Sequence, residues 1–237
     1  MQGAAAVAAP RRADRPLAVE LAGLAGAGKS SIAGALVELD PALRARPRVS
    51  WWRHLTSVPP LVPTFVSLHW PLRRVLGKEM KRLLRLRALH RLAEETKDCE
   101  ILVFDEGPVY LLARILVFGG KNIQTRGFER CWRRAVATWA ATLDAIVWLE
   151  APDDVLAPRL RSRPEHPFGD ADDRTVAALL RAYRQAFSRV IAELTAAGGP
   201  PVWTVRTDRG SSDVTARELL AGLRALRGDV HLVSEGP

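Results

Sequence analysis

The sequence predicts an α/β fold in which helices cover both faces of a parallel sheet. Five short apolar segments are typical of buried strands, at residues 17–21, 48–52, 100–104, 145–150 and 201–205. Helical segments alternate with them, including residues 29–39, 128–142, 175–197 and 213–226. Strands and helices that alternate along a chain favour a parallel sheet, and its ligands bind where the strands end. We therefore expect the functional residues directly after the apolar segments.

Local features of the sequence support three of the predicted helices. Residues 29–39 follow the first strand and end at Asp40-Pro41, a pair that stops helices. Residues 72–97 predict a long basic helix with Gly77 as its weak point. Residues 175–197 carry one apolar stripe with alternating spacings of four and three, made of Val176, Leu180, Tyr183, Phe187, Val190 and Leu194.

Length and composition predict a single globular domain. The chain has 237 residues, of which 48% are hydrophobic. We expect a disordered tail at residues 1–15, one domain at 16–228 and a C-terminal tail at 229–237. No apolar run approaches the roughly 20 residues of a membrane span, and the N-terminus is not typical of a secretory signal. By elimination we expect a cytoplasmic protein without a membrane partner.

The net charge of +9 first suggests a nucleic-acid partner. However, only five of the 35 basic residues are lysines, and arginine-rich usage of this kind is also typical of GC-rich genomes. Nucleic acid is therefore an alternative that we do not favour, and a homodimer is left open. Cys99 and Cys131 belong to no Cys-x-x-Cys or Cys/His cluster, which argues against a structural metal site.

Residues 23–30, GLAGAGKS, match the phosphate-loop pattern G-x-x-x-x-G-K-[ST] between a strand and a helix. Glycines let the backbone wrap around phosphate oxygens, and the helix that follows presents free N–H groups to the anion. Lys29 would reach the β- and γ-phosphates, and the Ser30 hydroxyl would ligate Mg²⁺. We expect ATP and Mg²⁺ to bind Gly23, Gly26, Ala27, Gly28, Lys29, Ser30 and Ser31.

An acidic pair follows the apolar strand at residues 100–104. A phosphate loop needs an acidic residue on a neighbouring strand to hold Mg²⁺ through water, and Asp105 fits this role. Glu106 would either polarise an attacking hydroxyl or water, or cap the next segment. The sequence alone leaves both roles open.

These motifs resemble those of the P-loop kinases that act on nucleotides and nucleosides, the thymidylate kinase-like ones in particular. The resemblance spans about residues 17–226. It rests on GLAGAGKSS, on ILVFDEGP at 101–108, on APDDVLAPRLRSRPEHP at 151–167 and on VWTVRTDRGSSDVTARELLAGL at 202–223. It implies the three-layer P-loop NTPase fold, with a five-stranded parallel sheet in the order 2-3-1-4-5. It also implies an acceptor-side helical region at 51–98 and a lid at 151–170.

The lid would contribute arginines to the reaction. Arg159 and Arg163 are four residues apart and share one face of a helix, whereas Arg161 points elsewhere. Arginines in this place would neutralise charge on the phosphoryl group during transfer. The alternative is a solvated basic end of a helix. We also expect Asp153 or Asp154 to cap this helix.

The acceptor side departs from the kinase pattern. Many nucleoside kinases carry a carboxylate directly after the second strand, where this chain reads SWWRH at residues 50–54. The role of the base therefore falls to Glu106 or Asp105. Arg53 and Arg126 are the expected acceptor-binding residues. The basic helix at 77–91 turns Lys78, Lys81, Arg82 and Arg85 to one face, toward either an anion or solvent.

We predict an ATP-dependent kinase that acts on a small molecule, nucleotide-like or nucleoside-like. Its catalytic residues would be Lys29, Asp105, Glu106, Arg159 and Arg163. The alternatives are an ATPase that uses Glu106 to activate water, a polynucleotide 5′-hydroxyl kinase and a nucleotide-binding module without catalysis. A regulatory GTPase is not favoured, because no guanine-reading [NT]-K-x-D segment is present.

Overall fold

The computed structural model describes residues 15–45, 47, 77–119, 123, 126–162 and 172–234. Within these residues, five strands form one parallel sheet in the order β2-β3-β1-β4-β5. The strands are β1 (Leu17–Gly23), β2 (Leu43–Ala45), β3 (Ile101–Phe104), β4 (Ala145–Glu150) and β5 (Val202–Arg206). The predicted fold class and strand order are confirmed.

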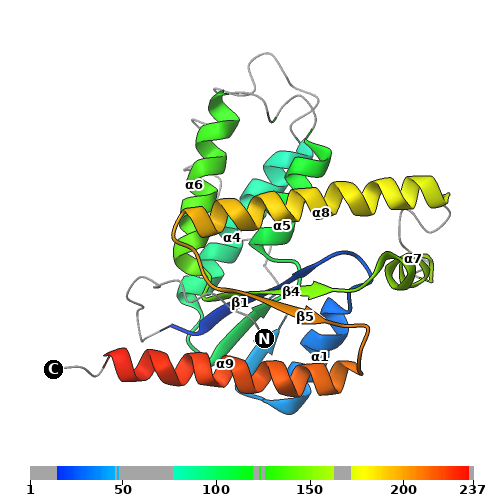
Figure 1. Cartoon of the computed structure of the whole chain (residues 1–237). Coiled ribbons are helices and arrows are strands. Elements are labelled where there is room, and N and C mark those ends of the chain that lie inside the picture. The colour runs from blue at the N-terminus through cyan, green and yellow to red at the C-terminus, as the bar shows by residue number, and fades with distance from the viewer. Residues whose placement is uncertain are drawn as a thin grey trace.

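Helices cover both faces of this sheet (Figure 1). One face carries α1 (Lys29–Leu39) and α9 (Ser212–Ser234). The other face carries α4 (Gly77–Glu95), α5 (Pro108–Phe118), α6 (Arg126–Thr142) and α8 (Asp173–Ala196). The short helix α7 (Asp153–Arg161) follows β4 at the end of the sheet. None of the described helices has the length and apolar character needed to cross a membrane.

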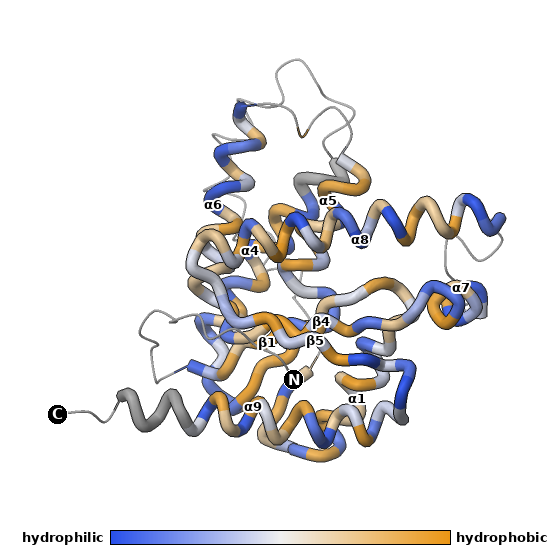
Figure 2. The backbone as a smooth tube through the Cα atoms, viewed as in Figure 1, coloured by the Kyte–Doolittle hydropathy of each residue, from blue (hydrophilic) through white to orange (hydrophobic). Residues whose placement is uncertain are grey.

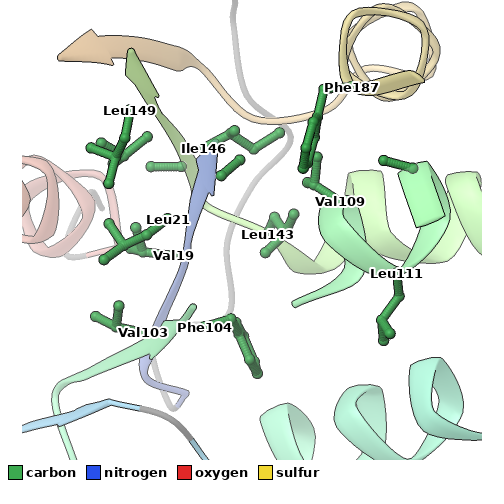
Figure 3. Packing of buried hydrophobic residues seen from close by; sticks show 14 of the residues in the cluster. Val19, Leu21, Val103, Phe104, Val109, Leu111, Leu143, Ile146, Leu149 and Phe187 are labelled. Atoms are coloured by element: carbon green, nitrogen blue, oxygen red, sulfur yellow. The ribbon is translucent and has the colours of Figure 1, made fainter. Parts of the chain in front are cut away.

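The hydrophobic core lies on both sides of the sheet. Alternate residues of a strand point to opposite faces, so β1 and its neighbours divide their side chains between the two helix layers. Figure 3 shows Val19, Leu21 and Val103 on one side and Phe104 on the other. All four are buried. Figure 2 shows the matching pattern in the helices, where hydrophobic and hydrophilic residues alternate along α6 and α9.

Two predicted elements differ from the structure. The second strand in the chain is Leu43–Ala45, earlier than the predicted residues 48–52, which lie outside the described part. It is a three-residue edge strand in which Leu43 is buried and Arg44 is exposed, so it lacks a continuous apolar run. Helix α9 continues to Ser234, so the segment predicted as a tail at 229–237 begins as helix.

A buried ion pair holds the start of the fold. Arg15, the last residue of the predicted tail, donates to both carboxylate oxygens of Asp144, at 2.8 and 3.0 Å. Asp144 is 5% exposed and also accepts the N–H of Ala18, at 2.7 Å. Because Ala18 lies in β1 and Asp144 directly precedes β4, the pair ties the beginnings of two neighbouring strands together.

Asp144→Ala should lower the free energy of unfolding by about 3 kcal/mol, because it leaves the Arg15 charge and the Ala18 N–H without their acceptor. Urea titration measures this loss. The exposed pair of Arg44 and Asp98, 2.7 Å apart, provides the control. Asp98→Ala should cost less than about 1 kcal/mol, since exposed ion pairs contribute little. Equal losses of unfolding free energy in the two variants would show that burial does not strengthen the pair of Arg15 and Asp144.

Candidate functional site

The phosphate loop joins β1 to α1 as the sequence predicts. Gly28 is the N-cap of α1, with φ 82°, and makes no side-chain capping hydrogen bond. The first turn of the helix contains no acidic residue. The positive end of α1 is therefore not offset by any cap or carboxylate of its own first turn, which suits it to bind an anion.

Lys29 lies against the beginning of this loop. Its Nζ donates to the carbonyl oxygens of Gly23, at 2.8 Å, and Leu24, at 2.9 Å. The side chain thus returns from the first residue of α1 to the end of β1. The positive charge of Lys29 is held at the loop, where phosphate groups are expected.

The tip of the loop packs on α7. Gly26 has φ 87°, a conformation that favours glycine, and a Cβ there would lie 3.1 Å from the carbonyl oxygen of Leu156. Arg159, also in α7, donates through Nη1 to the carbonyl oxygen of Gly26 at 3.3 Å. The structure therefore brings Arg159 of the predicted lid to the phosphate loop.

Ser30, in the first turn of α1, contacts Asp105, which follows β3. The Ser30 hydroxyl donates to Oδ2 of Asp105 at 3.3 Å, and Asp105 directly follows β3. A hydroxyl and a carboxylate side by side suit Mg²⁺, which prefers oxygen ligands and takes one or two carboxylates with phosphates and water. In the described part of the chain, no cluster of three or more His, Cys, Asp or Glu could hold a metal. A metal held by Ser30 and Asp105 would therefore depend on phosphate oxygens and water for its remaining ligands.

Glu106 faces the basic helix α4. Its Oε2 lies 3.4 Å from Nη2 of Arg85, and both side chains are about half exposed, at 50% and 41%. Arg82, one helical turn earlier, places its guanidinium 5.8 Å from the centre of the Phe118 ring. The basic face of α4 is thus not only a solvated surface, because Arg85 reaches the acidic turn after β3.

Glu20 is a buried carboxylate that the sequence analysis missed. It lies in β1, is fully buried, and accepts the N–H groups of Val109 at 2.7 Å and Tyr110 at 2.9 Å. Burial raises the pKa of Glu20 to about 8, while these N–H groups and the charge of Lys29 act to lower it. Glu20 therefore caps the first turn of α5, a role that the sequence analysis had offered to Glu106. A charged residue inside the apolar run LAVEL was the available signal.

The predicted cap of α7 is wrong. The N-cap position is taken by Pro152, and Asp153 accepts two hydrogen bonds from Arg184 of α8, at 2.6 and 3.3 Å. The Arg184 guanidinium holds the pKa of Asp153 below its usual range. At the other end of α7, Arg161 pairs with Asp173 of α8. Helix α7 is thus attached to α8 as well as to the phosphate loop.

Not all predicted site residues are placed by the structure. Arg53 and Arg163 lie outside the described residues. Arg126 is exposed and begins α6, at the end of that helix directed away from the sheet (Figure 1). The structure gathers the others at the carboxyl ends of the strands, namely Lys29, Ser30, Asp105, Glu106 and Arg159.

Several solved structures are similar to this chain along most of its length. A thymidylate kinase from Candida albicans is 13% identical, with a TM-score of 0.54, over 92% of this chain and 94% of its own. A deoxyadenosine kinase from M. mycoides with the products dCMP and dCDP bound is 13% identical, with a TM-score of 0.52, over 88% of this chain and 100% of its own. The same enzyme with bound dATP is 14% identical, with a TM-score of 0.50, over 87% of this chain and 97% of its own.

No family model and no curated protein sequence matches the chain. The likeness is therefore one of structure, and it agrees with the strand order and with the phosphate loop. The chain has the P-loop kinase fold in the form seen in nucleoside and nucleotide kinases.

Proposed function

We propose that the chain is a kinase that transfers the γ-phosphoryl group of Mg²⁺-ATP to a small acceptor, nucleotide-like or nucleoside-like. The observation that carries this proposal is the 3.3 Å contact between Ser30 and Asp105 beside the N-terminus of α1. A hydroxyl after a phosphate loop and a carboxylate on a neighbouring strand are the groups with which P-loop enzymes hold Mg²⁺ on a nucleoside triphosphate. Thymidylate and deoxyadenosine kinases of the same fold support the acceptor class.

The residues around the loop would bind the triphosphate. Backbone N–H groups at the start of α1 would cradle its phosphates, and Lys29 would exchange its two carbonyl partners for phosphate oxygens. Ser30 and Asp105 would hold Mg²⁺, which when bound neutralises negative charge on the phosphate oxygens. Arg159, already at the loop, would stabilise the charge on the phosphoryl group as it moves.

The acidic turn and α4 would serve the acceptor. Glu106 is half exposed and follows Asp105 at the end of β3, so we propose that it assists the acceptor group, taking the proton where that group is a hydroxyl; an acceptor phosphate needs no such base. Arg85, 3.4 Å from Glu106, holds that carboxylate beside α4. Arg53 and Arg126 remain proposed acceptor contacts.

Lys29→Ala should abolish transfer of label from γ-labelled ATP, because the charge that faces the transferred group is lost. The fold should persist, since the hydrogen bonds of Lys29 go to carbonyl groups of the loop. Transfer is measured with a panel of nucleosides, nucleotides, sugars and 5′-hydroxyl oligonucleotides, and folding by circular dichroism. Undiminished turnover in the folded variant would contradict the mechanism.

The same panel separates the alternatives. Release of labelled inorganic phosphate at the same rate whether or not an acceptor is present would favour an ATPase in which Glu106 activates water. Labelled oligonucleotides, with binding that weakens steeply as salt increases, would favour a polynucleotide 5′-hydroxyl kinase. Label on nucleotides or nucleosides alone supports the proposed function.

Arg159→Ala and Arg163→Ala should each lower kcat by about 100-fold while changing the dissociation constant of ATP only a few fold, because their charge is needed mainly during transfer. Arg161→Ala, in the same helix as Arg159, is the matched control. Its guanidinium pairs with Asp173 of α8, so its kcat should stay near that of the wild type. Losses confined to ATP affinity in the first two variants would show that the lid assignment is wrong.

A further inference from the structure

A buried carboxylate links β1 to the helix that follows the acidic turn. In the β1–β3 register, Glu20 lies opposite Phe104, the last residue of β3. Its two carboxylate oxygens accept the N–H groups of Val109 and Tyr110, at 2.7 and 2.9 Å. Both N–H groups belong to the first turn of α5, which begins at Pro108. Glu20 is therefore bound to the chain on the far side of the Asp105–Glu106 turn.

The first turn of α5 has no acceptor of its own for these groups. Its N-cap is Gly107, which has no side chain, and its first residue is a proline, which has no N–H. Glu20, 89 residues before Val109 in the chain, supplies the acceptor in place of a local cap. A buried N–H without an acceptor costs about 1–3 kcal/mol, so this contact constrains where α5 can begin.

The backbone of the turn also packs directly on Glu20. A Cβ at Gly107 would lie 2.8 Å from Cδ and Oε2 of Glu20 and 2.6 Å from Cβ of Phe104. No side chain fits between the turn and β1. The segment from Asp105 to Gly107 is therefore held at one end by β3 and at the other by Glu20.

We propose that Glu20 is a positioning residue that sets Asp105 and Glu106 relative to the phosphate loop. The strand that carries Glu20 also ends in that loop at Gly23, so one rigid element places both parts of the site. The contact between Ser30 and Asp105 and the position of Glu106 then depend on a carboxylate whose hydrogen bonds go to the first turn of α5. For its effect on turnover, this inference rests on the proposed kinase function.

Glu20→Gln tests the proposal with little change in shape. At an assay pH above the raised pKa of Glu20, about 8, both oxygens of its carboxylate accept, whereas in Gln the amide nitrogen cannot accept the second N–H of α5, so the turn should shift. We expect kcat to fall by about 10- to 100-fold, the effect of a small misplacement of reacting groups. The KM for ATP should change less than about 2-fold, because the hydrogen bonds from Lys29 to the carbonyl oxygens of Gly23 and Leu24 should persist in the variant.

Gly107→Ala disturbs the same turn, because its Cβ would clash with Glu20 and Phe104. It should likewise lower kcat and leave the KM for ATP nearly unchanged. The control is Asp144→Asn, another buried carboxylate that accepts an N–H of β1, from Ala18 at the opposite end of the strand. It should lower thermal stability at least as much as Glu20→Gln and leave kcat within about 2-fold of the wild type. If Glu20→Gln does not fold, Gly107→Ala and the control still decide the question.

A binding measurement separates this proposal from the proposed function. Calorimetry with a non-hydrolysable ATP analogue, with and without Mg²⁺, reports the contribution of Asp105 without any turnover. In Glu20→Gln and Gly107→Ala, the gain in affinity from Mg²⁺ should be at least about 5-fold smaller than in the wild type, while the Mg²⁺-free affinity is unchanged. If the wild type binds but transfers no phosphoryl group, the proposed function fails and this measurement still tests Glu20.

Two results would overturn the positioning role. One is folded Glu20→Gln and Gly107→Ala proteins with wild-type kcat and a wild-type gain in affinity from Mg²⁺. The other is an equal loss of kcat in Asp144→Asn, since activity would then follow stability and not the position of the turn.

Discussion

The whole candidate site depends on the parallel pairing of β1 with β3 and β4. Glu20 lies opposite Phe104 on one side, and Gly23 lies opposite Leu149 on the other. The phosphate loop, the acidic turn and the segment leading to α7 therefore leave the sheet at the same edge. A shift of one residue in β1 would turn Glu20 to the opposite face of the sheet and bury its carboxylate without the N–H groups of α5. The hydrogen bonds of Glu20 to the first turn of α5 thus couple the register of β1 to the geometry of the site.

The helices α1 and α5 both begin at this edge of the sheet, and their N-termini differ in capping. The first turn of α5 is satisfied by Glu20, and the start of α8 elsewhere is capped by Asp172. The start of α1 has a glycine N-cap, no side-chain cap and no acidic residue in its first turn. Because unpaired N–H groups at a helix end need an acceptor, the uncapped end of α1 is suited to phosphate. The contrast between α1 and α5 therefore supports the proposal that the N-terminus of α1 binds phosphate, whereas that of α5 is satisfied within the fold.

Local patterns predicted much of the fold, whereas long-range contacts were not visible in the sequence. The phosphate loop and the buried strands carry their own signals, glycine spacing in one case and continuous apolar runs in the other. Strand β2 has only three residues, with Arg44 exposed, so no such run marks it. The partners of Glu20 lie 89 and 90 residues away, and Arg184 lies 31 residues from Asp153. For α7 the prediction from the local capping rule was wrong. Pro152 occupies the N-cap position, and the Asp153 carboxylate accepts hydrogen bonds from Arg184 of α8.

The cations around the loop differ in what they bind, and this difference bears on the ligand. Arg161 and Arg184, which attach α7 to α8, are paired with carboxylates. Lys29 and Arg159 donate to main-chain carbonyl oxygens of the loop, and the charge of Lys29 also acts on the buried Glu20. A carbonyl dipole offsets less charge than a carboxylate, and a hydrogen bond between two ions is roughly twice as strong as one between neutral groups. Phosphate oxygens would therefore be better hydrogen-bond acceptors for these two cations than the carbonyl oxygens, which suits the loop to the anionic ligand that we propose.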